Sequence, residues 1–175
     1  MDSVILDSDA ISRAITRISY EIIEKNKGIE NLALIGIQRR GVIMANRLAE
    51  KLYQMEGKKL PVGILDITLY RDDLSMLTEH PVINGTSIDF VIEGKKLVLI
   101  DDVLFTGRTI RAAIEAICEL GRPAKIELAV MIDRGHRELP FRADYVGKNV
   151  PTSRSENVDV HFVELDSGDY VSITK

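Results

Sequence analysis

The sequence predicts a single α/β domain built on a mainly parallel sheet flanked by helices. Continuous apolar runs at 32–37 and 97–100, and a run at 126–132 that is apolar apart from Glu127, are typical of strands that are buried on both faces. Helical patterns occupy the segments between them, at 42–55 and 107–120. Strands and helices that alternate in this order favour a parallel sheet with helices packed against it.

Length and composition fit one domain that spans residues 1–175. A chain of 175 residues with 45% hydrophobic and 29% charged residues is ordinary for a globular protein with a proper core. The lone cysteine, Cys118, excludes an internal disulfide and fits a reducing compartment. Its place after Ile114 and Ile117 predicts a buried position on a helix.

The charge pattern and the start of the chain limit the classes of function. There is no apolar run of about 18 residues and no basic-then-apolar leader, so we expect a cytoplasmic protein with no membrane partner. The net charge is −4. Binding of nucleic acid would therefore need a local basic patch, because proteins that bind through their general field are usually basic.

The first elements are a short strand at 4–6 and an amphipathic helix over 11–24. Apolar residues recur in the helix every three or four positions, and Asp7, Ser8 or Asp9 can cap it. The next strand, 32–37, leads into Arg39, Arg40 and Gly41. Two arginines on a short turn suit a pyrophosphate, although such a pair taken alone is more often an ordinary surface feature.

A strand is predicted over 62–70, followed by an irregular stretch at 71–86 and a return strand at 88–92. Loops of this length in compact domains are usually functional lids or disordered segments. The alternative is an ordinary hairpin loop. Later strands are predicted over 126–132, 158–163 and 170–173.

The junction after the strand at 97–100 carries the clearest chemical signal. Asp101 and Asp102 end the strand, and Thr106, Gly107 and Thr109 stand at the start of the next helix. Unpaired N–H groups and the helix dipole make such a turn an anion site. The two carboxylates can accept hydrogen bonds from a ribose diol and lie near Mg²⁺. A plain solvated strand end is the alternative for an isolated acidic pair.

The string at 97–110 resembles the motif with which type I phosphoribosyltransferases bind phosphoribosyl pyrophosphate (PRPP). The resemblance implies that family's fold, with a small hood and a flexible loop that closes over PRPP. It implies catalytic roles for Arg40, Arg71, Asp101 and Asp102, and Mg²⁺ near the two aspartates, held indirectly through ribose hydroxyls or water. The implied substrate-binding residues are Arg39, Arg40, Gly41, Asp101, Asp102, Val103, Leu104, Phe105, Thr106, Gly107, Arg108 and Thr109, with Tyr145 stacking on the base and Val146 reading its edge.

Three longer strings, at 69–73, 101–109 and 133–145, are similar to one family in particular, the bacterial pyrimidine operon attenuation regulators. Members of that family are also uracil phosphoribosyltransferases. Phe105 supports a pyrimidine substrate, because purine enzymes usually carry an aspartate at this position. The implied ligands are PRPP, uracil and the uridine nucleotides UMP and UTP.

The same resemblance implies binding to the leader of pyrimidine-operon messages and a homodimer, and it leaves open whether dimers pair into a tetramer. Between 134 and 154 there are five basic residues against two acidic ones, a local excess that suits RNA. The expected RNA-binding residues are Thr16, Arg17, Tyr20, Lys25, Arg137, Arg142, Lys148 and Arg154. Tyr20 departs from the histidine often found at this position in the family.

A second hypothesis remains open, in which the protein is a phosphoribosyltransferase for uracil or another base and does not bind RNA. In that case the basic residues are solvated or pair with acids across a dimer interface. Substitution of Arg137 and Arg142 would separate the two hypotheses.

Overall fold

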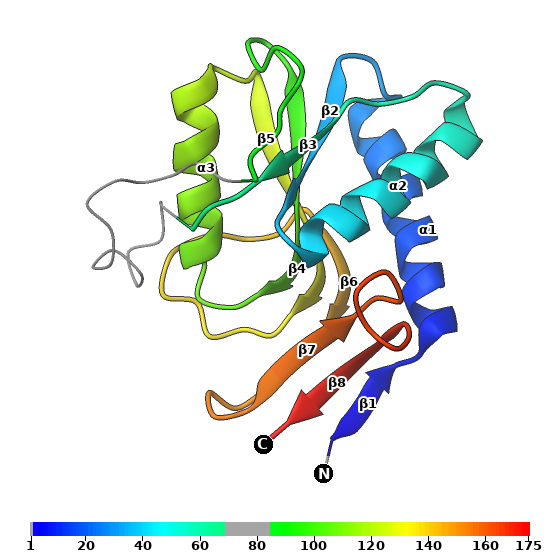
Figure 1. Cartoon of the computed structure of the whole chain (residues 1–175), viewed down its shortest axis with the longest axis vertical. Coiled ribbons are helices and arrows are strands. Elements are labelled where there is room, and N and C mark those ends of the chain that lie inside the picture. Colours follow the sequence, from blue (N-terminus) through cyan, green and yellow to red (C-terminus); the bar gives the residue numbers. More distant parts are fainter. Residues whose placement is uncertain (1, 69–84) are drawn as a thin grey trace.

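The computed structural model describes residues 2–68 and 85–175. It contains a five-stranded parallel sheet in the order β3-β2-β4-β5-β6, and a three-stranded antiparallel sheet in the order β1-β8-β7 (Figure 1). The elements in chain order are β1 (Ser3–Leu6), α1 (Ser8–Asn26), β2 (Leu32–Ile37), α2 (Arg40–Glu56), β3 (Val62–Leu65), β4 (Lys96–Leu104), α3 (Arg108–Leu120), β5 (Lys125–Asp133), β6 (Tyr145–Asn149), β7 (Asn157–His161) and β8 (Tyr170–Thr174). The predicted fold, a mainly parallel sheet with flanking helices and a small hood, is confirmed.

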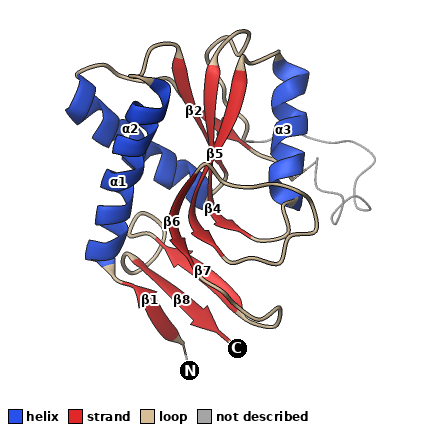
Figure 2. Ribbon diagram, turned by 180° about the vertical axis from the view of Figure 1, so that it is seen from behind, coloured by secondary structure: helices blue, strands red, loops and turns tan. Residues whose placement is uncertain are grey.

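Side-chain alternation along the central strands creates a core on each face of the large sheet. In β2, Leu32 and Leu34 face the helices α1 and α2, whereas Ala33 and Ile35 face α3. Figure 2 shows α1 and α2 together on one side of this sheet and α3 on the other. All six residues of β2 are buried, which explains why the sequence shows an unbroken apolar run there.

The ends of α1 follow standard capping chemistry. The side chain of Asp7 accepts a hydrogen bond from the N–H of Ala10 at 2.8 Å, so Asp7 is the cap among the three candidates. The helix ends at Lys27, which has a φ of 56°, and Gly28 follows. On α3 the expectation for Cys118 is wrong, because this thiol is exposed while the buried stripe runs through Ile110, Ala113 and Ile117.

Two strand predictions also need correction. The strand predicted over 62–70 ends at Leu65, because the carboxylate of Asp66 turns the chain by accepting from the N–H and hydroxyl of Thr68. The return strand predicted at 88–92 is absent from the described structure, which has only an isolated bridge between Ile64 and Ser87 there.

The topology places the loops that matter at one end of the molecule. The carboxyl ends of β2, β4, β5 and β6 meet at the same edge of the parallel sheet, and the hood sheet β1-β8-β7 lies beyond that edge (Figure 1). Ligands of open α/β sheets bind at this edge. Within the described ranges, no helix is long and apolar enough to cross a membrane.

Candidate active site

A cavity of about 350 Å³ lies at the junction of β4 and α3. Eight consecutive residues, 103–110, line it together with Glu138. Val103, Leu104, Phe105, Thr106, Gly107, Arg108 and Thr109 were all predicted to bind substrate. The hydroxyl of Thr106 accepts from the N–H of Arg108 at 3.3 Å, and the turn leads straight into the first turn of α3. Loop and helix start therefore enclose a space suited to an anion.

Gly107 is required at this turn for two reasons. Its φ of 92° lies in the left-handed region, and a Cβ there would lie 3.0 Å from the ring of Phe141. Phe141 belongs to the segment 135–142, which packs on the loop. The N–H groups of Glu138 and Leu139 both donate to the carbonyl of Thr106, at 2.9 and 3.0 Å.

Asp101 and Asp102 lie in the carboxyl-terminal half of β4, directly before Val103, which is the first residue that lines the cavity. Asp101 is buried and Asp102 is half-buried. One oxygen of each carboxylate is oriented by the backbone, since Asp101 accepts from the N–H of Asp102 and Asp102 from the N–H of Val103, both at 2.9 Å. This orientation fixes the direction in which the two carboxylates could accept hydrogen bonds from a bound diol.

The two aspartates fit Mg²⁺ only as a metal shared with a ligand. In the part of the chain that the structure describes, no three His, Cys, Asp or Glu side chains are grouped to hold a metal ion. Mg²⁺ commonly takes one or two carboxylates, substrate phosphates and water, and does not need an all-protein cage. The acidic pair is therefore compatible with the indirect role predicted for it.

The predicted pyrophosphate turn lies next to this acidic pair. The peptide bond between Gln38 and Arg39 is cis, and α2 begins at Arg40. A Cβ on Gly41 would meet the carbonyl oxygen of Ile100 at 2.5 Å and the Cα of Asp101 at 3.3 Å, so only glycine permits this approach. The turn and the end of β4 are thus in direct contact. Arg39 is exposed there.

The side chain of Arg40 reaches toward the hood. Its Nη2 atom lies 3.0 and 3.3 Å from the two carboxylate oxygens of Asp166, in the loop that joins β7 to β8. Arg71, the remaining predicted catalytic residue, and most of the predicted loop at 71–86 lie outside the described residues.

Tyr145 and Val146, which were predicted to bind the base, do not line the cavity at 103–110. Tyr145 pairs with Ala129 at the beginning of β6, four residues before Asn149, which pairs with Asp133 at the carboxyl edge. At about 3.3 Å per residue, Tyr145 lies roughly 13 Å along the strand from that edge. Its side chain is only 2% exposed, so the ring is not available to a base. The carbonyl of Val146 accepts instead from Arg17, at 2.8 Å.

Tyr145 belongs to a buried polar group beneath α1. Its hydroxyl donates to the carboxylate of Glu127 at 2.5 Å, and the amide of Asn26 lies 3.2 Å from it. Burial, together with the bond to Glu127, raises the pKa of the phenol. Burial tends to raise the pKa of Glu127, but the bonds from Tyr145 and Lys125 outweigh it and the pKa is lowered.

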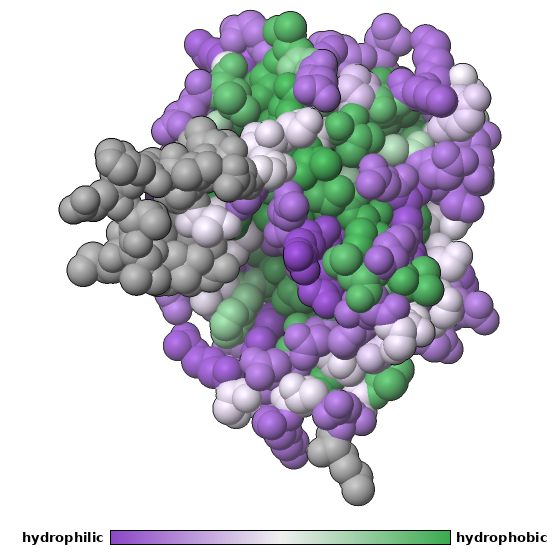
Figure 3. Space-filling view, in the orientation of Figure 1, coloured by the Kyte–Doolittle hydropathy of each residue, from purple (hydrophilic) through white to green (hydrophobic). Residues whose placement is uncertain are grey.

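Four of the predicted RNA-binding residues lie on α1, where Figure 3 shows many hydrophilic side chains along the right-hand side of the molecule. Tyr20 is 60% exposed. Arg17 donates to the carbonyls of Val146 and Gly147, and Lys25 pairs with Asp144 at 2.6 Å. Thr16 donates to the carbonyl of Ser12. The start of β6 is therefore bound to α1, which brings these two parts of the predicted surface together.

The other predicted RNA-binding residues differ from one another in their surroundings. Arg142, Lys148 and Arg154 are exposed. Arg137 is half-buried, and its guanidinium donates to the carbonyls of Phe105 and Phe141, both at 2.9 Å, and to the carboxylate of Asp133. Arg137 thus connects the segment 135–142 to the cavity loop, a structural role that sequence reasoning did not assign.

Sequence reasoning also missed three residues that shape the site. Glu138 lines the cavity and pairs with Arg108 at 2.9 Å. Arg134 is buried and stacks on the ring of Phe105, with its guanidinium carbon 4.0 Å from the ring centre. Asp166 holds Arg40. Their contacts join segments distant in sequence. Only the string at 133–145 gave any signal, since it contains Arg134 and Glu138.

Comparisons with known proteins agree with this geometry. A family model for the phosphoribosyl transferase domain matches residues 3–164. A protein named bifunctional protein PyrR from Acetivibrio thermocellus is 68% identical over 170 residues, which cover 97% of this chain and 92% of the relative. A protein of the same name from Clostridioides difficile is 59% identical over 169 residues, which cover 97% of this chain and 96% of that relative.

Solved structures support the fold independently. A hypoxanthine phosphoribosyltransferase from Staphylococcus aureus is 22% identical, with a TM-score of 0.74 and coverage of 99% of this chain and 92% of that one. The enzyme of the same name from Trypanosoma cruzi is 18% identical, with a TM-score of 0.74 and coverage of 98% and 95%. The family match and the close relatives together show that this chain is a phosphoribosyltransferase of the PyrR family.

Proposed function

We propose that the protein transfers the phosphoribosyl group of PRPP to uracil, giving UMP and pyrophosphate, and that it also binds RNA as a regulator of pyrimidine operons. The observation that carries the enzymatic part is the cavity at 103–110, because its anion site at a helix start directly follows two oriented carboxylates on the same strand. The relatives named bifunctional protein PyrR support both parts.

PRPP has three groups to place, and the site offers a suitable surface for each. The 5′-phosphate fits the turn at Thr106–Thr109, where N–H groups and hydroxyls gather at the start of α3. The ribose diol then faces Asp101 and Asp102. The pyrophosphate extends toward the turn that contains Arg39, Arg40 and Gly41, which touches the end of β4. Arg71 is proposed to add a further arginine to the pyrophosphate.

In the reaction, the bond between C1′ and the pyrophosphate oxygen breaks as a bond from uracil N1 to C1′ forms. Positive charge develops on the ribose, and negative charge develops on the departing oxygen. Asp101 and Asp102 stabilise the positive charge on the ribose, and the guanidinium of Arg40 stabilises the negative charge on the departing oxygen. The N1 proton passes to solvent water, because no protein base is assigned to it. Mg²⁺, when bound with PRPP, would neutralise pyrophosphate charge and orient the ribose hydroxyls.

The choice of base is proposed to depend on Phe105 in the cavity loop at 103–110. Phe105, where purine enzymes usually have an aspartate, is backed by the guanidinium of Arg134 and offers no carboxylate to a purine nitrogen. A uracil N1 nucleophile does not need one. The predicted stacking by Tyr145 is not part of this proposal, because that ring is buried under α1.

The regulatory part rests on the basic surface that α1 and the later segments form. Arg142, Lys148 and Arg154 are exposed, and α1 adds Arg17 and Tyr20. Positive side chains of this kind can neutralise RNA phosphates, and an exposed tyrosine can stack on an unpaired base. We propose a homodimer, in which the same faces of two chains extend this surface, acting on messages in the cytoplasm.

The second candidate is a uracil phosphoribosyltransferase without an RNA role. It is favoured by the contacts of Arg17, Lys25 and Arg137, which pair with groups of this chain. The two candidates agree on the enzyme and differ only in RNA binding.

The test is a gel-shift titration with a pyrimidine-operon leader stem-loop, with and without UMP at stated salt, alongside an assay of uracil turnover. Tight binding that UMP strengthens, together with turnover, supports the bifunctional protein. Turnover with weak binding that UMP does not change supports the second candidate. An Asp102→Asn variant should lose turnover by about 100-fold, because a group placed against developing charge is worth that much. It should keep its RNA affinity.

A further inference from the structure

The contact between Arg40 and Asp166 connects the predicted pyrophosphate turn to the hood. Arg40 is the first residue of α2, and Asp166 lies in the loop at 162–169 between β7 and β8. Both oxygens of Asp166 face one nitrogen of the guanidinium, Nη2, at 3.0 and 3.3 Å. The Arg40 side chain is 35% exposed and that of Asp166 is 17% exposed, so the pair is partly shielded from water.

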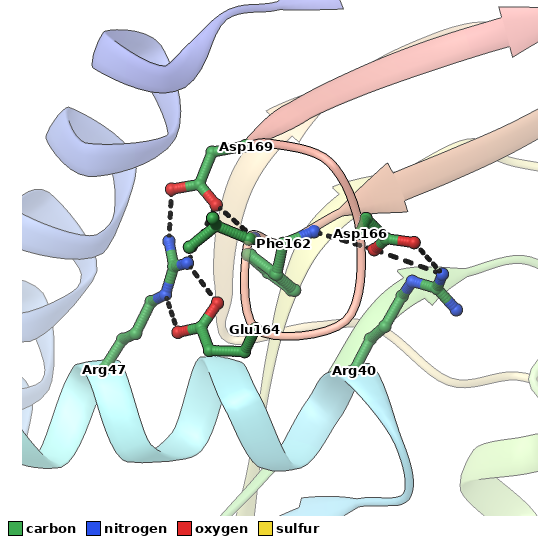
Figure 4. A network of polar contacts seen from close by, with 7 residues as sticks. Arg40, Arg47, Phe162, Glu164, Asp166 and Asp169 are labelled. Carbon is green, nitrogen blue, oxygen red and sulfur yellow. Dashed lines mark hydrogen bonds and ion pairs between the residues drawn. The ribbon is translucent and has the colours of Figure 1, made fainter.

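Asp166 is itself fixed from several sides. It accepts from the N–H of Phe162 at 3.0 Å, and Nδ1 of His161 lies 3.6 Å from its other oxygen. The loop is anchored a second time by Arg47, which pairs with Glu164 and Asp169 and lies over the ring of Phe162, 4.7 Å from its centre. Figure 4 shows Arg40 and Arg47 rising from the same helix on either side of this loop.

The guanidinium of Arg40 is held but not saturated. An arginine has five N–H donors, and Asp166 engages only those on Nη2. The Nε atom is buried and finds no acceptor among the described residues. Gly41, the next residue, lies against the Cα of Asp101. The turn that carries the anchored Arg40 is therefore in contact with the strand that carries the acidic pair, and the Nη1 donors of its guanidinium have no partner among the described residues.

We propose that Asp166 is a positioning residue, which fixes the guanidinium of Arg40 so that its remaining donors meet the pyrophosphate group of PRPP. The proposal rests on the proposed function, in which Arg40 binds that group. A free arginine side chain would have to be ordered each time PRPP binds. A carboxylate that is already fixed by the backbone removes this cost before the ligand arrives.

The test compares Asp166→Asn and Asp166→Ala with a matched control, Asp159→Asn. The control removes the same charge from the same hood sheet at an exposed position of β7. We expect Asp166→Ala to raise the KM for PRPP and the dissociation constant of magnesium pyrophosphate by about tenfold, and Asp166→Asn by less because it keeps an acceptor. The KM for uracil should change by less than about twofold in all three variants, and the control should match the wild type.

Two further measurements separate positioning from a merely structural role. Loss of the hood contact alone would lower the unfolding midpoint and the active fraction, with the KM for PRPP unchanged, and that result would overturn the proposal. A fall in the KM for PRPP would also overturn it, since Asp166 would then be a competitor of the pyrophosphate. In a double-mutant cycle with Arg40→Lys, the two substitutions should be strongly non-additive.

The binding readout keeps this proposal apart from the proposed function. Calorimetric titration with magnesium pyrophosphate needs no turnover. If the wild type binds pyrophosphate but does not convert uracil, the proposed function fails, and the Asp166 variants still decide the role of this residue. Equal pyrophosphate affinities in the wild type and Asp166→Ala would overturn the positioning role alone.

Discussion

At Gly107 one backbone conformation serves both the turn and the packing around it. Its φ of 92° and the Phe141 ring, 3.0 Å from where a Cβ would stand, penalise any side chain. We expect Gly107→Ala to cost about 1–3 kcal/mol of stability and to weaken PRPP binding, because the loop must shift where it forms the cavity. Urea denaturation and a PRPP titration measure the two effects.

Gly28→Ala is the matched control for this substitution. Gly28 also has a positive φ, 110°, but a Cβ there would have nothing within 4 Å. The control should lose about 1 kcal/mol through its backbone conformation alone and should bind PRPP as the wild type does. Equal PRPP affinities in the two variants would show that the contact with Phe141 is not needed for the shape of the cavity.

Tyr145 tests whether a base contacts this ring. Its hydroxyl donates to the buried carboxylate of Glu127, so Tyr145→Phe removes the partner of a charged group. We expect a loss of about 2 kcal/mol of stability with the KM for uracil unchanged. Tyr53→Phe, at a ring that is 40% exposed, should be nearly neutral in both assays. Tyr145→Leu, which removes the ring itself, should also leave the KM for uracil unchanged, and a raised KM in that variant would return the residue to the base site.

At the scale of elements, the sequence predicts what periodicity and turn chemistry encode. The buried strands at 32–37 and 126–132 are apolar runs, interrupted only by Glu127 in the second, and the structure places strands there to within a residue. The predicted strand at 62–70 kept its alternation beyond Leu65, but a local side-chain turn at Asp66 ended it. Alternation reports which residues can face a core, and it does not report where pairing with a neighbour stops.

Contacts between distant segments explain what the sequence could not predict about the site. The turn at 103–110 is local, so its motif was sufficient to find it. Tyr145 was assigned from its position in a string, whereas its burial depends on packing against α1. Asp166 meets Arg40 only through the hood, 126 positions along the chain, and no local pattern marks that meeting.

The loop at 162–169 should make stability depend on acidity. The bond from Arg47 lowers the pKa of Glu164 and of Asp169 in the folded protein. The unfolded chain then binds protons at higher pH than the folded one. The stabilisation is therefore present above the ordinary pKa values of 4.5 and 3.8, and it is lost as the pH falls through the lowered ones.

Arg47→Met should reveal this contribution in urea denaturation between pH 6 and pH 3. Without the guanidinium, the pKa values of Glu164 and Asp169 return toward their ordinary range, and stability should fall less steeply with acidification than in the wild type. Lys58→Met, which removes a well-exposed pair with Glu30, is the control and should keep the wild-type slope. Identical slopes in wild type and Arg47→Met would contradict the assignment.

At the scale of the whole molecule, the segment 135–142 is proposed to contribute to both activities, catalysis and RNA binding. Arg137 joins this segment to the carbonyl of Phe105 in the cavity loop, whereas Arg142 is exposed. We expect Arg142→Gln to weaken RNA binding about tenfold, to reduce the salt slope by about one and to leave catalysis intact. Arg137→Gln should weaken RNA binding and also raise the KM for PRPP. If Arg137→Gln and Arg142→Gln changed catalysis equally, this division of roles between the two arginines would be contradicted.

If one segment carries both contacts, nucleotide and RNA must influence each other by the same factor. Binding of UMP in the cavity would order the loop at 103–110 and, through Arg137, the segment beneath the RNA. Linkage then requires that RNA tighten UMP as much as UMP tightens RNA. In the wild type, UMP should raise the affinity for RNA by the same factor, greater than one, by which RNA raises the affinity for UMP. In Arg137→Gln both factors should be near one. A variant that keeps the full coupling would place the connection elsewhere, with the contacts of α1 to the start of β6 as the remaining route.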